Sequence, residues 1–193
     1  MVVSQVMAAG LLGVLGLLIA SFLNVVIFRL PVMMEAQWKA ECAELNGQPA
    51  PDVPPFNLMV PRSRCRQCGH QLSWFENIPV FSYLVLRGQC RHCKDAISPR
   101  YPLIELVNGA LFAWCGWHWG ATPVALLWCG YSATLLVLAM IDWDTTLLPD
   151  SITLPLLWAG LIAAALGLIA VPLQASLWGA VAGYLSLWLV YWA

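Results

Sequence analysis

Two groups of residues in this sequence could do chemistry: cysteines in two Cys-x-x-Cys pairs, and aspartates between two apolar segments. The pairs are Cys65–Cys68 and Cys90–Cys93, with residues 69–89 between them. The spacing within each pair lets a tight turn point both thiolates at one ion, and the distance between the pairs is close to that of known four-cysteine zinc sites. Four thiolates form a closed tetrahedral shell with no free position for a substrate. The sequence therefore predicts a structural zinc site.

The aspartates lie in the segment Ile141–Asp150, which separates two long apolar runs. Carboxylates at a membrane boundary are costly to desolvate, so they are solvated, paired or functional. Peptide hydrolysis by carboxylates needs two that share one proton, so that one activates water and the other protonates the carbonyl oxygen. Asp142 and Asp144 would point to different sides of a helix. We interpret the segment as a polar turn, with Asp144 a solvated neighbour and Asp150 the N-cap of the next helix.

The composition places these residues in a membrane protein. Hydrophobic residues make up 61% of the chain, charged residues 10%, and the mean hydropathy is +0.75. Soluble domains carry about 25% charged residues. All nine lysines and arginines lie between Arg29 and Arg100. By the positive-inside rule the loop between these arginines is cytoplasmic and the N-terminus is periplasmic.

We expect an all-α polytopic membrane protein with about five transmembrane helices and a cytoplasmic four-cysteine zinc-binding loop. Pro31 should end the first helix because its ring removes a backbone donor. No basic segment precedes that helix, so we expect it to be retained rather than cleaved as a signal peptide. The expected membrane helices are 6–30, 103–119, 124–141, 152–170 and 176–193. The expected domains are 1–30 (first transmembrane helix), 31–101 (zinc-binding loop domain) and 102–193 (transmembrane domain of four helices).

Within the loop, residues 34–45 read as a short amphipathic helix, and Gly47 is a plausible stop for it. Residues 48–61 contain five prolines and read as a linker. In the apolar part of the chain, Asn24 is interpreted as a contact between helices. His118 lies among aromatic residues and is interpreted as part of an interfacial belt.

Two disulfides or a redox pair are the alternatives to zinc. The predicted topology places the loop in the reducing cytoplasm, where disulfides are rare. His70 and His92 flank the cysteines, but four thiolates already complete the shell. Cys42, Cys115 and Cys129 belong to no motif, and we expect them to be buried and inert.

An ordered set of motifs resembles the bacterial type IV prepilin peptidases. The resemblance runs from Ala20 to at least Leu157, with alanine at position 20 where glycine is usual and Arg66 where proline often stands. The matching segments are Ser21-Phe22-Leu23-Asn24-Val25-Val26, Arg29-Leu30-Pro31, the two Cys-x-x-Cys pairs, Glu76-Asn77-Ile78-Pro79, Arg100-Tyr101-Pro102-Leu103-Ile104-Glu105, Ile141-Asp142 and Leu148-Pro149-Asp150.

The resemblance implies an inner-membrane enzyme with two activities, an aspartic endopeptidase and an S-adenosylmethionine-dependent N-methyltransferase. It would remove the leader peptide of type IV prepilins or type II secretion pseudopilins and methylate the new N-terminus. Asp142 matches the first catalytic aspartate. The candidates for the methyltransferase, by resemblance and position, are the cytoplasmic loop, Asn24, Arg29 and Glu105. We expect prepilins and membrane lipid as partners, and no nucleic acid.

The family's second catalytic aspartate lies in a Gly-x-Gly-Asp motif that these 193 residues do not contain. No basic residue follows the last apolar run. We therefore expect the chain to be an N-terminal portion that does not cleave prepilin in isolation. A membrane thiol-disulfide oxidoreductase and a non-catalytic zinc-loop scaffold remain the alternative interpretations.

Overall fold

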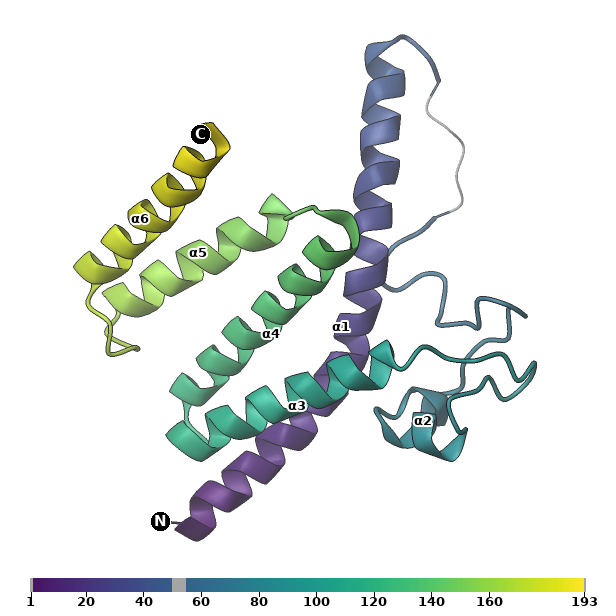
Figure 1. Cartoon of the computed structure of the whole chain (residues 1–193), viewed down its shortest axis with the longest axis horizontal. Helices are drawn as coiled ribbons and strands as arrows, with labels where there is room; N and C mark the ends of the chain where they lie inside the picture. The colour runs from purple at the N-terminus through teal and green to yellow at the C-terminus, as the bar shows by residue number, and fades with distance from the viewer. Residues whose placement is uncertain (1, 50–54, 193) are drawn as a thin grey trace. The chain divides into compact units, whose positions relative to one another are not determined.

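The computed structural model describes residues 2–49 and 55–192, and these are helical with no named strand. The chain divides into two compact units, 1–147 and 148–193. Among the described helices, three are long and apolar enough to cross a membrane: α1 (Val2–Leu45), α4 (Pro123–Thr145) and α6 (Leu173–Trp192). This confirms the all-α membrane class predicted from composition (Figure 1).

The first helix does not end at Pro31. Helix α1 is one continuous helix of 44 residues with Pro31 inside it, so the predicted end at Leu30 was wrong. A proline removes one helical hydrogen bond, and the polar segment that follows contains alanine, glutamate and lysine, which favour the helix. The amphipathic helix expected at residues 34–45 therefore exists, but as the continuation of α1.

The stop predicted at Gly47 for the helix at residues 34–45 is confirmed, and it is the end of the continuous helix α1. Gly47 has a φ of +66°, its N–H donates to the carbonyl of Glu44, and the N–H of Gln48 donates to that of Ala43. This pair of bonds is a Schellman motif, which needs a residue in the left-handed region. Of the linker predicted at 48–61, residues 50–54 lie outside the described residues.

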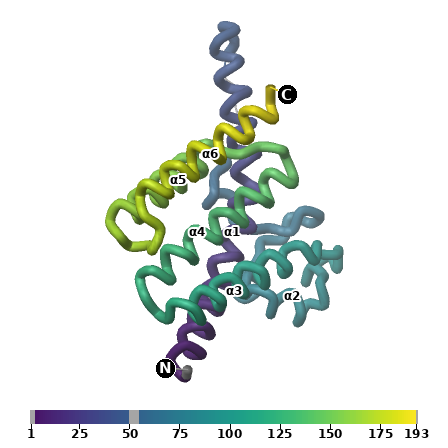
Figure 2. The backbone as a smooth tube through the Cα atoms, turned by 60° about the vertical axis from the view of Figure 1, so that its left-hand side comes forward, coloured from purple at the N-terminus to yellow at the C-terminus, as the bar shows by residue number. Residues whose placement is uncertain are grey.

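Helix α3 (Arg100–Trp119) and helix α4 pack on α1 (Figure 1, Figure 2). Glycines on both helices let the backbones of α1 and α3 approach closely. A Cβ added at Gly16 would lie 2.8 Å from Phe112, and one added at Gly116 would lie 2.7 Å from the carbonyl oxygen of Ala8. The buried amide of Asn108 donates to the carbonyl of Gly16 at 2.7 Å. Close approach of backbones is how helices pack in lipid.

The turn between α3 and α4 is capped at both ends. Gly120 has a φ of +65° and follows α3, while the hydroxyl of Thr122 accepts from the N–H of Ala125 at the start of α4. Helix α4 then runs to Thr145, four residues beyond the predicted end at Ile141. Asp142 and Asp144 are therefore helical, and the polar turn begins only at Thr146.

The second unit consists of α5 (Asp150–Ala165) and α6. Asp150 is the first residue of α5, and Pro149 holds the N-cap position, so the prediction that Asp150 caps this helix was wrong. The carbonyl of Pro149 accepts from the N–H groups of Ile152 and Thr153. An acidic residue in the first turn still favours the positive end of the helix.

The loop between α1 and α3 contains two short helices, η1 (Trp74–Asn77) and α2 (Phe81–Val85). Two isolated antiparallel bridges, Arg64–Gln71 and Gln89–Ala96, close turns before and after these helices. Each bridge spans one Cys-x-x-Cys pair. The loop is therefore built around its cysteines rather than around a large apolar core.

Candidate functional site

The two cysteine turns have the same backbone structure. In the first, the N–H of Gly69 donates to the carbonyl of Cys65, and the N–H of Cys65 donates to that of His70. In the second, 25 residues later, the N–H of Lys94 donates to the carbonyl of Cys90 in the same way. Gly69 and Lys94 both have positive φ, +71° and +61°. Each turn thus forms a knuckle that leaves its two sulfurs on one side.

The four sulfurs of Cys65, Cys68, Cys90 and Cys93 form one cluster, with all Sγ atoms within 4.8 Å of one another. The Sγ atoms of Cys65 and Cys93 are 3.8 Å apart, and those of Cys68 and Cys90 are 4.0 Å apart. A tetrahedron with metal–sulfur bonds of about 2.3 Å has sulfur–sulfur edges of about 3.8 Å. The arrangement therefore fits a single tetrahedral metal ion, as the sequence predicted.

The thiols differ in how easily they lose a proton. Backbone N–H groups of Cys68 and Gln67 lower the pKa of Cys65 to about 7, and those of Cys93 and His92 lower that of Cys90. The N–H of Asp95 lowers the pKa of Cys93, but desolvation and the three neighbouring thiols outweigh it and raise the pKa to about 12. Without a cation, four thiolates would repel one another, whereas a bound metal ion holds all four deprotonated.

The two histidines beside the cluster stack on each other. The rings of His70 and His92 are 5.6 Å apart and nearly parallel, and Nε2 of His70 lies 3.6 Å from Oε2 of Glu76. Glu76 is buried and also accepts from the N–H of Ser73 at 2.7 Å, which completes a capping box at η1. The backbone bond from Ser73 is the main reason that the pKa of Glu76 lies below its usual value. These groups support the knuckles from outside the sulfur cluster.

Arginine side chains attach the loop to the helices. Arg29 of α1 is 8% exposed and donates to the carbonyls of Asn57 at 2.8 Å and Pro61 at 2.6 Å. Arg66, inside the first knuckle, lies 4.1 Å above the ring of Phe28 and donates to the hydroxyl of Tyr101 at 3.0 Å. A salt-bridge partner is not needed, because carbonyls and an aromatic face take up the cationic groups.

A second attachment joins the segment after η1 to the membrane helices. The hydroxyl of Ser21 donates to the carbonyl of Asn77 at 3.2 Å, and the N–H of Val80 donates to Oε2 of the buried Glu105 at 2.7 Å. Val80 has a φ of +57°, a region that β-branched residues avoid. Asn24 donates to the carbonyl of Tyr101 at 3.3 Å, which confirms the predicted contact between helices.

The C-terminal end of α4 carries Asp142, the candidate catalytic residue. Asp142 lies exposed in the last turn of α4, and its carbonyl accepts from the N–H of Thr146. Asp144 is exposed, as expected of a solvated residue, and Arg100 also binds both of its carboxylate oxygens, at 2.6 Å each. The two aspartates therefore have different roles, and they do not form a carboxylate pair with each other.

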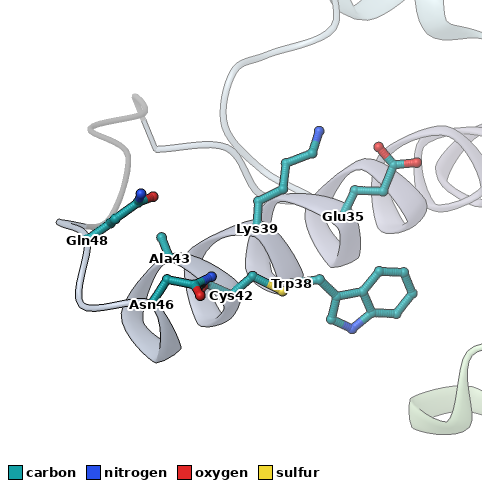
Figure 3. A pocket seen from close by; sticks show the side chains of 7 residues that line it. All are labelled: Glu35, Trp38, Lys39, Cys42, Ala43, Asn46 and Gln48. Atoms are coloured by element: carbon teal, nitrogen blue, oxygen red, sulfur yellow. Dashed lines mark hydrogen bonds between the residues drawn. The ribbon is translucent and has the colours of Figure 1, made fainter.

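The remaining cysteines follow the sequence expectation in part. Cys115 and Cys129 are buried in the apolar cluster of α1, α3 and α4, but Cys42 is exposed. Cys42 lines a shallow hollow near the end of α1. Glu35 and Lys39 line the same hollow, and their side chains point to the same side of the helix (Figure 3). The prediction of burial failed for Cys42 because it sits on the polar part of α1 beyond the apolar run.

Sequence reasoning assigned no structural role to several residues that hold the loop or the helix ends in place: Ser21, Glu76 and the Arg100–Asp144 pair. The Ser-x-x-Glu pattern of residues 73–76 is a recognisable capping-box signal. The ion pair joins residues 44 positions apart and had no local signal.

Comparison with known proteins identifies relatives over nearly the whole chain. Residues 14–119 match the bacterial peptidase A24 N-terminal domain, and residues 129–193 match the type IV leader peptidase family. No solved structure matches the chain.

Curated relatives carry the name prepilin leader peptidase/N-methyltransferase. The protein of Stutzerimonas stutzeri is 53% identical over 184 residues, covering 93% of this chain and 62% of the relative. That of Pseudomonas aeruginosa is 51% identical over 179 residues, covering 92% and 61%. That of Neisseria gonorrhoeae is 50% identical over 185 residues, covering 95% and 64%. The chain thus spans less than two thirds of the length of these relatives, and with both family models matched in order it belongs to the type IV leader peptidase family, including that family's bacterial N-terminal domain.

Proposed function

We propose that this chain is part of a membrane aspartic endopeptidase that removes the leader peptide of type IV prepilins or type II secretion pseudopilins and then N-methylates the new N-terminus. The observation that carries this proposal is the identity of about 50% to relatives named for both activities. The presence of Asp142 at the position given by the resemblance supports the peptidase assignment.

In this proposal Asp142 is one of two catalytic carboxylates. Its place in an exposed last turn leaves the carboxylate accessible to a substrate and to a second carboxylate. Asp144 is not that partner because Arg100 occupies both of its oxygens. The partner that the resemblance supplies is the aspartate of a Gly-x-Gly-Asp motif. When two such groups share one proton, the ionised one takes a proton from water and the protonated one donates to the peptide carbonyl.

We infer that the sulfur cluster binds Zn²⁺ as a structural ion. Cys65, Cys68, Cys90 and Cys93 would hold it, and the sulfur–sulfur distances of 3.8 and 4.0 Å support a tetrahedral shell. Bound zinc would supply folding free energy to a loop with a small apolar core. A thiol-disulfide oxidoreductase is the less favoured function, since two redox pairs would not need all four sulfurs within 4.8 Å.

For the methyl transfer, the donor is proposed to be S-adenosylmethionine, on the basis of the resemblance and the relatives' names. Three residues were candidates for this activity, and each one joins separate segments of the chain. Arg29 binds the loop near Pro61 and Glu105 binds the N–H of Val80 in the loop, whereas Asn24 of α1 binds the carbonyl of Tyr101 in α3. We propose that Arg29 and Glu105 act by fixing the loop against the helices, and that Asn24 acts by fixing α3 against α1.

The proposed location is the bacterial inner membrane, with the N-terminus periplasmic and the zinc loop cytoplasmic. The confinement of all lysines and arginines to residues 29–100 supports this orientation. The division into residues 1–30, 31–101 and 102–193 is kept as a proposal for the domain organisation.

The test is a prepilin cleavage assay with the protein expressed from its complete gene in membranes. We expect Asp142→Asn to abolish cleavage, because an amide cannot take part in proton transfer. Glu44→Gln, the same change at an exposed glutamate of α1, should cleave normally. Methylation is measured separately, by the mass of the N-terminal residue of a pre-cleaved pilin supplied with S-adenosylmethionine. Normal cleavage by Asp142→Asn would refute the catalytic role of Asp142.

A further inference from the structure

The N-terminal end of α3 and the C-terminal end of α4 are joined by an ion pair. Arg100 is the first residue of α3, and Asp144 lies in the last turn of α4. The two guanidinium nitrogens each lie 2.6 Å from one carboxylate oxygen. Nη2 also lies 3.5 Å from the carbonyl oxygen of Met140, one turn earlier. Arg100 therefore contacts a side chain and the backbone of the same helix end.

A cation stabilises the C-terminal end of α4 because negative charge collects there. The C-terminus of a helix carries a partial negative charge, and carboxylates near it are unfavourable there. The last turn of α4 carries two, Asp142 and Asp144. Arg100 offsets this charge and also reaches the carbonyl of Met140. The two-pronged geometry also fixes direction, which a lysine ammonium would not do.

The pair is poorly suited to a purely stabilising role. The side chains of Arg100 and Asp144 are 36% and 32% exposed, and ion pairs that exposed add little to folding stability. Its geometric effect is larger. Residues two apart on a helix are about 200° apart around its axis. With Asp144 held against α3, Asp142 is turned to the opposite side of α4, away from α3.

Arg100 is itself fixed by its neighbours. The carbonyl of the next residue, Tyr101, accepts from Asn24 of α1, and the Tyr101 hydroxyl accepts from Arg66 of the first cysteine knuckle. The start of α3 is thus held from two directions, so Arg100 provides a defined point from which to hold the end of α4.

We propose that Arg100 is a positioning residue for the peptidase. By binding both carboxylate oxygens of Asp144, it sets the rotation of the last turn of α4. This rotation sets the direction of the Asp142 carboxylate. This inference rests on the proposed function, in which Asp142 is catalytic. In this inference neither Arg100 nor Asp144 takes part in the chemical step. The pair acts on that step only through the position of Asp142.

The experiment measures kcat and KM for prepilin cleavage with the protein expressed from its complete gene. The variants are Arg100→Gln, Asp144→Asn, the double variant and Arg100→Lys, with Arg62→Gln as the matched control at an exposed arginine. We expect each single neutral variant to lower kcat by about 10- to 100-fold, since small misplacement of a catalytic group has effects of that size. KM should change by less than about twofold. The double variant should be no worse than either single one, because both remove the same interaction.

Arg100→Lys separates geometry from charge. It keeps the cation but loses the two-pronged contact, so we expect a kcat between those of wild type and Arg100→Gln. A wild-type kcat for Arg100→Lys or for Arg100→Gln, or a fall in kcat that matches a loss of thermal stability, would overturn the positioning role. Asp142→Asn is assayed in parallel. If it cleaves normally, the proposed function fails first; if it is inactive while Arg100→Gln is fully active, only the positioning role fails.

Discussion

At the scale of single residues, the acidic side chains differ in what surrounds them. Glu76 is buried and bonded to the backbone at Ser73, Asp144 is paired with an arginine, and Asp142 is exposed. A buried and bonded carboxylate contributes to stability, whereas an exposed one is free to react. The distinction follows from neighbours, since the side chains are chemically almost the same.

Glu76 gives a prediction about pH. Its pKa is lower in the folded loop than in the unfolded chain, because the Ser73 N–H and then His70 favour the charged form. Its contribution is therefore fully present above pH about 4.5 and lost as the pH falls through the lower folded value. We expect Glu76→Gln to destabilise the loop at pH 7 by about 1 kcal/mol, because a neutral amide oxygen accepts the bond from the Ser73 N–H more weakly than a carboxylate does.

The measurement is unfolding of the loop between pH 7 and 3, followed by hydrogen exchange of the backbone amides of the loop. Zinc is also released in acid, since thiolates take up protons. The difference between wild type and Glu76→Gln isolates the carboxylate, and this difference should shrink as the pH falls. A difference in stability that stays constant with pH would contradict the lowered pKa of Glu76 in the folded loop. Glu44→Gln serves as the control at an exposed site.

At the scale of elements, the close contact between α1 and α3 depends on glycines. Gly116 faces the backbone of Ala8, which has no flexible end that could move aside. Gly130 of α4 has no atom within 4 Å of the place where its Cβ would be. The same substitution should therefore have opposite effects at the two positions.

We expect Gly116→Ala to destabilise the helical unit by about 1–3 kcal/mol, the usual cost of overpacking. Gly130→Ala should be neutral or stabilising by up to about 1 kcal/mol, because alanine is the better helix former. Thermal unfolding in detergent, followed by circular dichroism, gives the comparison. Equal effects of the two variants would mean that α1 and α3 do not approach as closely as the structure has them.

At the scale of the whole molecule, the loop and the helices are held by different contacts. The loop has two short helices and depends on the knuckles for its shape. Helices α1, α3 and α4 pack on one another without the cluster. Removal of the metal should therefore affect the loop far more than the helices.

We expect the purified protein to contain about one zinc ion per chain, and Cys90→Ser to abolish it. A strong chelator or this substitution should expose residues 62–98 to limited proteolysis while far-UV helicity is retained, because the metal supplies the folding free energy of such loops. Cys42→Ser, outside the cluster, should keep its metal. Thiols that react with an alkylating reagent equally fast before and after chelation would argue against a metal site.

The sequence by itself determined the helical membrane class and the cysteine cluster, since the first depends on composition and the second on a repeated Cys-x-x-Cys spacing. It misjudged Pro31, whose effect on a helix is set by the residues around it, and Asp150, whose neighbour Pro149 takes the cap. Only the tertiary structure decided that Arg100 holds Asp144. That contact depends on how α3 and α4 pack against α1, and no pattern within either segment records the packing of helices distant in the chain.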